Sequence, residues 1–269
     1  MKILSVLALA VLALAMGVIG LLAASPTPLE AEPLDTTLAE PVMLRLAEPV
    51  AVVELFTSEG CSSCPKADRL LVELAERDDP RLLPLAFHVD YWNRLGWTDP
   101  FSDAAYSQRQ RAYARTFQSG RVYTPQMIVN GRREFVGSRR HEAQSAIRQA
   151  LTESAPAVIR LLATTAADAV TVTYSVEDAP EETVLNLALV QRRAAQSIPR
   201  GENAGRTLEH ANVVRAFATV DAEAGTQTLP LPAGLNAEEV AVVAYVQDPE
   251  TMQMYGAGQA SVRAAGAAG

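Results

Sequence analysis

The sequence has little cysteine: only Cys61 and Cys64, among 269 residues, carry a thiol. Two cysteines exclude a fold held together by many disulfides, and their spacing of three positions indicates a single motif. Basic residues are also outnumbered, with 23 Lys and Arg against 31 Asp and Glu, so the formal net charge is −8. A surface of this sign repels phosphate backbones, and we therefore expect no nucleic-acid partner.

The composition shows neither the high charge nor the low hydrophobicity of a disordered chain. Hydrophobic residues make up 49% and charged residues 20% of the sequence, which is ordinary for a globular protein. The length favours roughly two domains.

The N-terminal segment is predicted to direct export. Lys2 precedes an uncharged apolar run over residues 3–24, and the small residues 23–25 suit a signal peptidase. We expect residues 1–25 to be a signal peptide or, if uncleaved, a membrane anchor, because such a run spans a core of about 30 Å. Residues 26–49, rich in Pro, Glu and Ala, are predicted to be a tether. The protein would then be periplasmic or secreted, or held at the inner membrane.

Residues 50–155 alternate between strand-like and helix-like patterns. The Asn130-Gly131 pair between two apolar runs is a strong hairpin signal. The expected elements are strands at 50–56 and 82–89, helices at 65–77 and 102–117, a hairpin at 126–136 and a helix at 140–153. The order is β-α-β-α-β-β-α, which predicts an α/β domain.

Residues 156–264 carry short alternating segments without helices between them. These segments lie at 158–162, 170–176, 184–190, 213–220, 226–231, 240–246 and 255–262. Seven short strands of this kind predict an all-β, immunoglobulin-like sandwich as a second domain. The polar stretch 201–215 is predicted either to bind a ligand or partner, or to lie as a loop against the first domain.

The chemistry concentrates in residues 58–65, where the two cysteines follow a buried strand and precede a helix. Cys61 would lie near the helix N-terminus, where the dipole and unpaired amides lower the pKa of a thiol. Cys64, one turn later, is close enough for a disulfide that forms and opens reversibly. We therefore expect Cys61 to attack and Cys64 to resolve the mixed disulfide. Pro65 suits the first helical turn.

The element order with a C-x-x-C pair after the first strand resembles the thioredoxin fold. In that fold a cis-proline precedes the third strand and faces the cysteines, and Thr124-Pro125 stands at the corresponding place. The resemblance implies that Pro125 shapes a substrate groove. The chain also resembles an uncharacterised family of exported thioredoxin-like proteins, which has no settled role. The matching segments are 53–65, 87–92, 123–127, 201–206 and 210–215.

Thioredoxin buries an acid six residues before the nucleophile, where it accepts a proton from the resolving thiol. Glu54 lies seven residues before Cys61. We interpret Glu54 either as that proton acceptor or as a strand acid paired with a basic neighbour. Residues 88–97 form an aromatic and polar patch, either a groove wall beside the thiols or a loop packed on a core edge. Arg109, Arg111 and Arg115 are expected on a solvated helix face.

The predicted function is thiol–disulfide exchange on protein thiols or disulfides, as a reductase or isomerase, with a possible membrane electron donor and no cofactor. The neutral Ser62 and Ser63 can stabilise a thiolate only weakly, and the nearby Glu59 disfavours it electrostatically, which favours a potential nearer about −270 mV than about −120 mV. Three alternatives stay open. One is a copper carrier using Cys61 and Cys64, with His88 as a candidate third ligand, as in exported thioredoxin-like copper carriers. The others are a partner-binding module and a structural disulfide, although so short a loop constrains the unfolded chain little. Zinc is disfavoured because no second cysteine or histidine pair follows.

Overall fold

The computed structural model describes residues 48–77 and 79–264. The predicted export segment 1–25 and nearly all of the tether 26–49 lie outside the described residues. Within the described ranges, no helix is long and apolar enough to cross a membrane. The elements are β1 (Ala51–Thr57), α1 (Pro65–Ala75), β2 (Leu82–His88), the 3₁₀ helix η1 (Asp90–Leu95), α2 (Ala104–Thr116), β3 (Gln126–Val129), β4 (Arg133–Val136), α3 (Arg140–Ala150), β5 (Val158–Ala166), β6 (Ala169–Glu177), β7 (Val184–Ser197), β8 (Thr207–Asp221), β9 (Gly225–Pro230), the 3₁₀ helix η2 (Ala237–Glu239), β10 (Val240–Gln247) and β11 (Met254–Ala264).

Local sequence patterns explain where these elements begin and turn. Pro65 occupies the first turn of α1, where its missing N–H costs no hydrogen bond. Asn130 and Gly131 have φ values of 49° and 68°, the left-handed conformation that a tight hairpin turn between β3 and β4 requires. All seven residues of β1 are buried, as expected for a strand covered on both faces.

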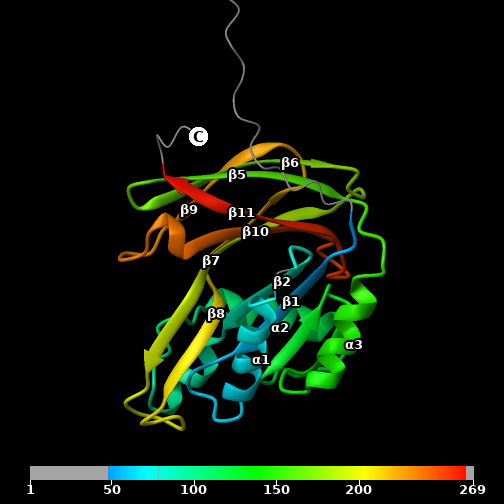
Figure 1. The fold of residues 1–269 in the computed structure, drawn as a ribbon. Coiled ribbons are helices and arrows are strands. Elements are labelled where there is room, and N and C mark those ends of the chain that lie inside the picture. Colours follow the sequence, from blue (N-terminus) through cyan, green and yellow to red (C-terminus); the bar gives the residue numbers. More distant parts are fainter. Residues whose placement is uncertain (1–47, 78, 265–269) are drawn as a thin grey trace, which may run out of the picture. The chain divides into compact units, whose positions relative to one another are not determined.

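The described strands form one mixed sheet of 11 strands in the order β4-β3-β1-β2-β8-β7-β10-β11-β5-β6-β9 (Figure 1). The predicted fold class, a thioredoxin-like domain at 50–155 followed by a separate immunoglobulin-like sandwich at 156–264, is therefore wrong. The two halves join where β2 pairs in parallel with β8, with Ala86 opposite Val213. Apolar alternation locates strands but does not say which strand covers an open edge, and here β8 covers the edge of β2.

The sheet folds over itself, so its strands lie in layers (Figure 1). Val53 and Leu55 of β1 pack with α1 and α3 in one core. Val52 and Phe56, which point to the other face of β1, pack with α2, β7 and β10 in a second core. A third core fills the space between β10 and the strands β5, β6 and β9. β10 is consequently buried on both faces, and it contacts β1 through side chains only.

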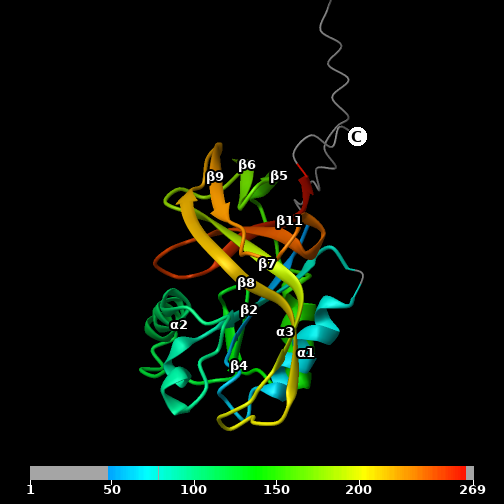
Figure 2. The same ribbon diagram turned by 90° about the vertical axis from the view of Figure 1, so that its left-hand side faces the viewer.

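The hairpin of β7 and β8 is longer than the sequence predicts and brings a distant segment to the helical layer. Figure 2 shows both strands running from the strand layer to the side of α1. Val213 of β8 and Ala194 of β7 pack in the core that α1 forms with β1. Residues 198–206 make the tip of this hairpin, and that tip builds part of the site described below.

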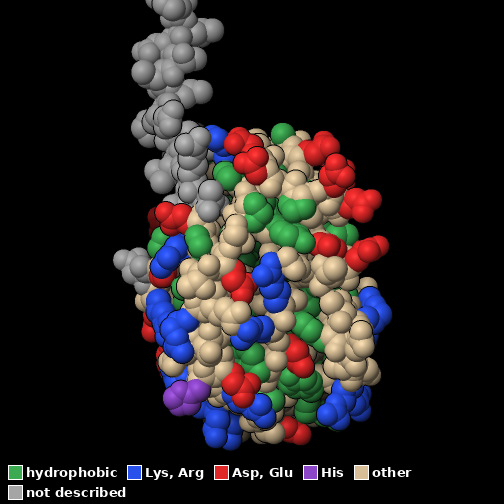
Figure 3. Space-filling view, turned by 90° about the vertical axis from the view of Figure 1, so that its right-hand side faces the viewer, with side chains coloured by type: hydrophobic (Ala, Val, Ile, Leu, Met, Phe, Trp, Pro, Cys, Tyr) green, Lys and Arg blue, Asp and Glu red, His purple; other side chains and the backbone are tan. Residues whose placement is uncertain are grey.

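Charge is unevenly distributed over the face drawn in Figure 3. Acidic side chains gather at the end that β5 and β6 occupy, and Lys and Arg side chains lie mainly toward the helical end. On this face, acidic side chains are therefore most concentrated away from the helices.

Candidate functional site

Cys61 and Cys64 form a disulfide in the loop between β1 and α1, with their Cα atoms 5.4 Å apart. Cys64 caps α1 with helical backbone angles, and its carbonyl accepts hydrogen bonds from the N–H groups of Ala67 and Asp68. Both cysteines are fully buried, whereas Ser62 between them is exposed. In this oxidised form Cys61 is therefore no closer to solvent than Cys64.

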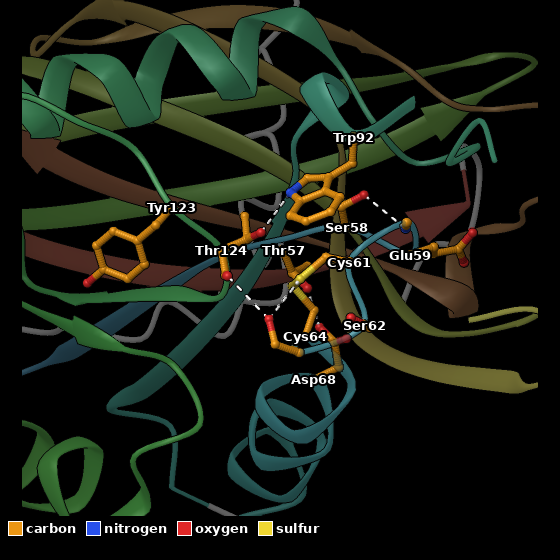
Figure 4. Close-up of a disulfide and its surroundings, with 12 residues drawn as sticks. Thr57, Ser58, Glu59, Cys61, Ser62, Cys64, Asp68, Trp92, Tyr123 and Thr124 are labelled. Atoms are coloured by element: carbon orange, nitrogen blue, oxygen red, sulfur yellow. Dashed lines mark hydrogen bonds between the residues drawn. A yellow bond between two sulfur atoms is a disulfide. The ribbon is translucent and has the colours of Figure 1, made fainter. Parts of the chain in front are cut away.

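Pro125 lies beside the disulfide loop, and the Thr124–Pro125 peptide is cis, as the resemblance implies. The Ser63 hydroxyl lies 3.5 Å from the Thr124 carbonyl oxygen and 3.3 Å from Cys61 Sγ. Trp92 Nε1 donates to Thr124 Oγ1 at 2.8 Å (Figure 4). The segment before β3 is thereby held against the loop that carries the cysteines.

The aromatic patch predicted at residues 88–97 surrounds the same loop. Gly60 faces Trp92 so closely that a Cβ at position 60 would lie 3.2 Å from Trp92 Cβ. Trp97 Nε1 donates to Glu59 Oε2 at 2.8 Å. The patch therefore forms a wall beside the disulfide and also packs its loop against the core.

The tip of the β7–β8 hairpin covers the disulfide loop. The fully buried Asn203 donates through Nδ2 to the carbonyl oxygens of Glu59 and Cys61 at 2.8 and 2.9 Å. The Ser62 N–H donates to Glu202 Oε2 at 3.0 Å, and the Ser62 side chain and backbone together lower the pKa of Glu202. Of the polar stretch 201–215, residues 201–206 lie as a loop against the first half of the chain, whereas residues 207–215 belong to strand β8 and not to a loop.

Asp68 is a buried acid on α1, one helical turn after Cys64. Its Oδ1 accepts a 2.7 Å hydrogen bond from Thr57 Oγ1 (Figure 4). Burial raises the pKa of Asp68, although the charges of His210 and His88 act to lower it. Asp68 is thus a carboxyl group that binds a proton more readily than an exposed aspartate.

Two histidines from neighbouring strands lie next to this acid. The His88 and His210 rings meet edge to face with their centroids 4.8 Å apart. His88 Nδ1 lies 2.7 Å from Asp99 Oδ2, and His210 Nε2 lies 3.2 Å from Glu59 Oε1. Burial acts to lower the pKa of His88, but the Asp99 charge and hydrogen bond outweigh it, so that pKa is raised. Asp68, His88, His210, Asp99 and Glu59 are called the acid–histidine cluster below.

Glu54 lies elsewhere, on the face of β1 opposite Thr57. Its Oε1 accepts from Arg109 Nε at 2.7 Å and from the Tyr245 hydroxyl at 3.1 Å, and its Oε2 accepts from the Tyr113 hydroxyl. Of its two interpretations, the structure has the one in which Glu54 pairs with a basic neighbour. The prediction that Arg109 is solvated is wrong, because only 10% of its side chain is exposed.

The copper interpretation finds no assembled ligand set among the described residues. No three His, Cys, Asp or Glu side chains there are arranged to hold a metal ion. His88, the expected third ligand, is bound through Nδ1 to Asp99.

Sequence reasoning missed Asp68 as a site residue, and it included Asn203 and His210 only within the candidate stretch 201–215, without placing them at the cysteines. Asp68 stands four positions after Cys64, the spacing that places two side chains on one helix face, and this signal was available. His210 and Asn203 lie in segments that carry the family resemblance, but nothing local indicates that they reach the cysteines.

Comparisons with known proteins match the chain to a family and to solved structures. The model of a family described as "Protein of unknown function (DUF1223)" matches residues 52–247. A search of curated proteins found no significant match. The crystal structure of protein AGR_C_4864 from Agrobacterium tumefaciens is 26% identical with a TM-score of 0.60, over 79% of this chain and 94% of that one. HBP35 of Porphyromonas gingivalis is 17% identical with a TM-score of 0.57, over 81% of this chain and 78% of that one, a likeness of fold alone.

Proposed function

Because the chain belongs to the DUF1223 family, whose description assigns no activity, we propose a function from the site: thiol–disulfide exchange on protein substrates. Cys61 attacks a substrate disulfide, and Cys64 then resolves the mixed disulfide. Pro125 and Thr124 position the substrate chain beside the two sulfur atoms. The protein acts as a reductase or isomerase.

The observation that carries this proposal is the Cys61–Cys64 disulfide at the start of α1, beside the cis Thr124–Pro125 peptide. A disulfide that closes so short a loop constrains the unfolded chain little, so stability alone is a weak reason for it. The Ser63 hydroxyl, 3.3 Å from Cys61 Sγ, is placed to donate a hydrogen bond to a Cys61 thiolate. A neutral donor of this kind helps the thiolate modestly, which supports a potential nearer about −270 mV than about −120 mV.

Substrate access requires a movement, because both cysteines are fully buried in the disulfide form. The hairpin tip is attached to the disulfide loop by the hydrogen bonds of Asn203 and Glu202. Displacement of this tip exposes Cys61 while leaving β7 and β8 paired. The proposed activity therefore depends on the rate at which residues 198–206 leave the loop.

The decisive experiment is capture of substrates by Cys64→Ser in the full chain. This variant should hold substrates on Cys61 as mixed disulfides, which non-reducing electrophoresis and mass spectrometry identify. Cys61→Ser is the matched control and should capture none, since the remaining Cys64 is the resolving thiol. Equal labelling of the two variants, or none in either, contradicts the proposal. Metal analysis after anaerobic purification tests copper binding in the same samples.

The thioredoxin-like relationship and the export of the chain belong to the same proposal. The C-x-x-C pair before α1 and the cis-proline before β3 support the relationship. The apolar run at residues 3–24 supports export to the periplasm or beyond, where a membrane donor would keep the cysteines reduced. Cell fractionation, combined with N-terminal sequencing of the mature chain, tests the location and the cleavage.

A further inference from the structure

Three buried polar atoms near the disulfide lack hydrogen-bond partners among the described residues. They are Asp68 Oδ2, His88 Nε2 and His210 Nδ1. The three side chains come from α1, β2 and β8, and Asp68 lies within range of the charges of both histidines. Buried polar atoms are nearly always paired, so such a group of unpaired atoms needs a chemical reason.

The burial of carboxyl groups in the acid–histidine cluster supplies one. The cluster holds three carboxyl groups and two imidazoles, and all five side chains are buried. Arg215, on β8, is the further charged group that acts on Asp99. An ionised carboxylate is costly in such a buried site, and burial raises the pKa of Asp68, whose Oδ2 has no hydrogen-bond partner among the described residues.

We propose that Asp68 takes up the proton that the Cys64 thiol loses when the Cys61–Cys64 disulfide closes, and returns it when the disulfide is reduced. This inference rests on the proposed function and names a residue that serves it. Asp68 lies in a suitable position to accept this proton, because its N–H donates to the Cys64 carbonyl at 3.1 Å in an i, i+4 turn. Side chains at this spacing lie roughly 5–6 Å apart at Cβ, so the thiol and the carboxyl group can approach each other for proton transfer directly or through one water molecule.

The exchange transfers one proton to Asp68 and one electron pair to the substrate sulfur. In the mixed disulfide, Cys61 Sγ is bonded to a substrate sulfur, and the Cys64 thiol passes its proton to the Asp68 carboxylate. The Cys64 thiolate attacks Cys61 Sγ, the new sulfur–sulfur bond forms, and the substrate sulfur leaves with the electron pair of the broken bond. The cysteine pair is oxidised and the substrate disulfide is reduced. A dithiol donor reverses the sequence, and Asp68 reprotonates Cys64.

The disulfide form described here is the state in which Asp68 carries the proton. Its raised pKa agrees with that state.

The kinetic test measures ring closure. The reduced full chain is mixed with oxidised glutathione, quenched with acid, and the Cys61–glutathione mixed disulfide is quantified by mass spectrometry. Asp68→Asn, which keeps the shape of the side chain, should slow ring closure about 10- to 100-fold and accumulate the mixed disulfide. Asp68→Glu should restore much of the rate. Glu73→Gln, on the exposed side of α1, is the control and should behave as wild type.

The outcomes separate the inference from the proposed function. Equal ring-closure rates in wild type and Asp68→Asn overturn the inference and leave the proposed function intact. Absence of any mixed disulfide in wild type overturns the proposed function.

A second measurement follows the proton directly and does not depend on exchange with a protein substrate or glutathione. Infrared difference spectra of wild type before and after reduction with dithiothreitol should lose a protonated-carboxyl band, and Asp68→Asn should lack it. A band that is missing from oxidised wild type, or unchanged on reduction, overturns the inference.

Discussion

Glu54 and Asp68 are both buried acids that face opposite sides of the same sheet, and their surroundings differ completely. Each carboxylate oxygen of Glu54 has at least one donor, supplied by Arg109, Tyr113 and Tyr245. Asp68 has Thr57 on one oxygen, and no protein partner within the described residues on the other. A fully paired acid holds a structure in place, whereas a partly paired acid is free to exchange a proton.

The Glu54 carboxylate is paired with the Arg109 guanidinium, which is itself surrounded by aromatic rings. The Arg109 guanidinium lies 5.2–5.7 Å from the ring centroids of Phe87, Tyr113, Phe217 and Tyr245. Burial and the Glu54 charge raise the pKa of Tyr113 well above its usual value, so its hydroxyl stays a donor. The network joins β1, α2 and β10 across one core, and its role is structural.

We expect the largest loss of stability when Arg109, the cation that pairs with Glu54, is removed. Arg109→Ala leaves the Glu54 charge buried without its cation, and we expect the free energy of unfolding to fall by about 3–5 kcal/mol. Urea unfolding followed by circular dichroism measures it. Arg111→Ala, an exposed arginine on the same helix, should change stability by less than about 0.5 kcal/mol. A similar loss in both variants would remove the contrast between the two arginines.

An intermediate effect is expected where the hairpin tip covers the disulfide. Asn203→Ala leaves the buried carbonyl groups of Glu59 and Cys61 without their donor, which should cost roughly 1–3 kcal/mol. It should also speed reduction of the Cys61–Cys64 disulfide by dithiothreitol, because the cover detaches more often. The exposed Ser197→Ala is the control on the same hairpin. An unchanged reduction rate in Asn203→Ala would mean that the tip does not limit access.

The next effect in size is the pH dependence of the free energy of unfolding, which should distinguish Asp68 from the fully paired Glu54. The raised pKa of Asp68 stabilises the fold fully below its unfolded pKa, and that contribution is lost as pH rises through the folded pKa. Asp68→Asn should therefore gain stability relative to oxidised wild type as pH rises from about 4, by at most about 1.4 kcal/mol per pH unit. Urea unfolding of both proteins across pH 4–8 measures the difference. A difference that is constant with pH argues against proton binding by Asp68.

Other titratable groups of the acid–histidine cluster also make the free energy of unfolding of wild type depend on pH. To first order their contributions are the same in Asp68→Asn, so they cancel in the difference between the two proteins. His88, with its raised pKa, adds stability that is lost as pH rises through its folded pKa. Burial acts to raise the pKa of Asp99, but the His88 charge and hydrogen bonds lower it. Asp99 therefore adds stability that is lost as pH falls through its folded pKa.

The smallest effect is expected at Glu202, which is exposed and accepts one hydrogen bond from the Ser62 N–H. Glu202→Gln should leave the urea midpoint unchanged within error and raise the rate of disulfide reduction slightly. The same dithiothreitol assay used for Asn203→Ala makes the comparison. A larger effect of Glu202→Gln than of Asn203→Ala would mean that the hydrogen bond of the exposed Glu202, and not those of the buried Asn203, mainly holds the hairpin tip over the disulfide.

The sequence predicts the elements of this molecule better than their partners. The strands, the three α-helices, the Asn130-Gly131 turn and the cis peptide before β3 are confirmed. The strands, the helices and the turn depend on residues close together in the chain, so local periodicity and turn chemistry suffice for them, whereas the cis peptide is what the resemblance to the thioredoxin fold implies. The pairing of β2 with β8 depends on residues far apart, and no local pattern encodes it.

The candidate site likewise contains residues that local sequence predicts and residues that it does not. The disulfide follows from the spacing of Cys61 and Cys64, and Asp68 is recoverable from the helical repeat after Cys64. Arg109 was misplaced because a basic residue on a helix is usually solvated, whereas here it neutralises a strand acid inside the core. Asn203 lies 142 positions after Cys61, so its contact needs the whole sheet to form.

That separation of 142 residues also sets an order in time. Synthesis runs from the N-terminus at roughly 5–20 residues per second, so Asn203 is made about 7–30 s after Cys61. Throughout that interval the two thiols exist without the segment that later covers them. An oxidant that meets the two thiols before residues 198–206 are in place therefore reaches them more easily than in the finished fold, where both cysteines are buried.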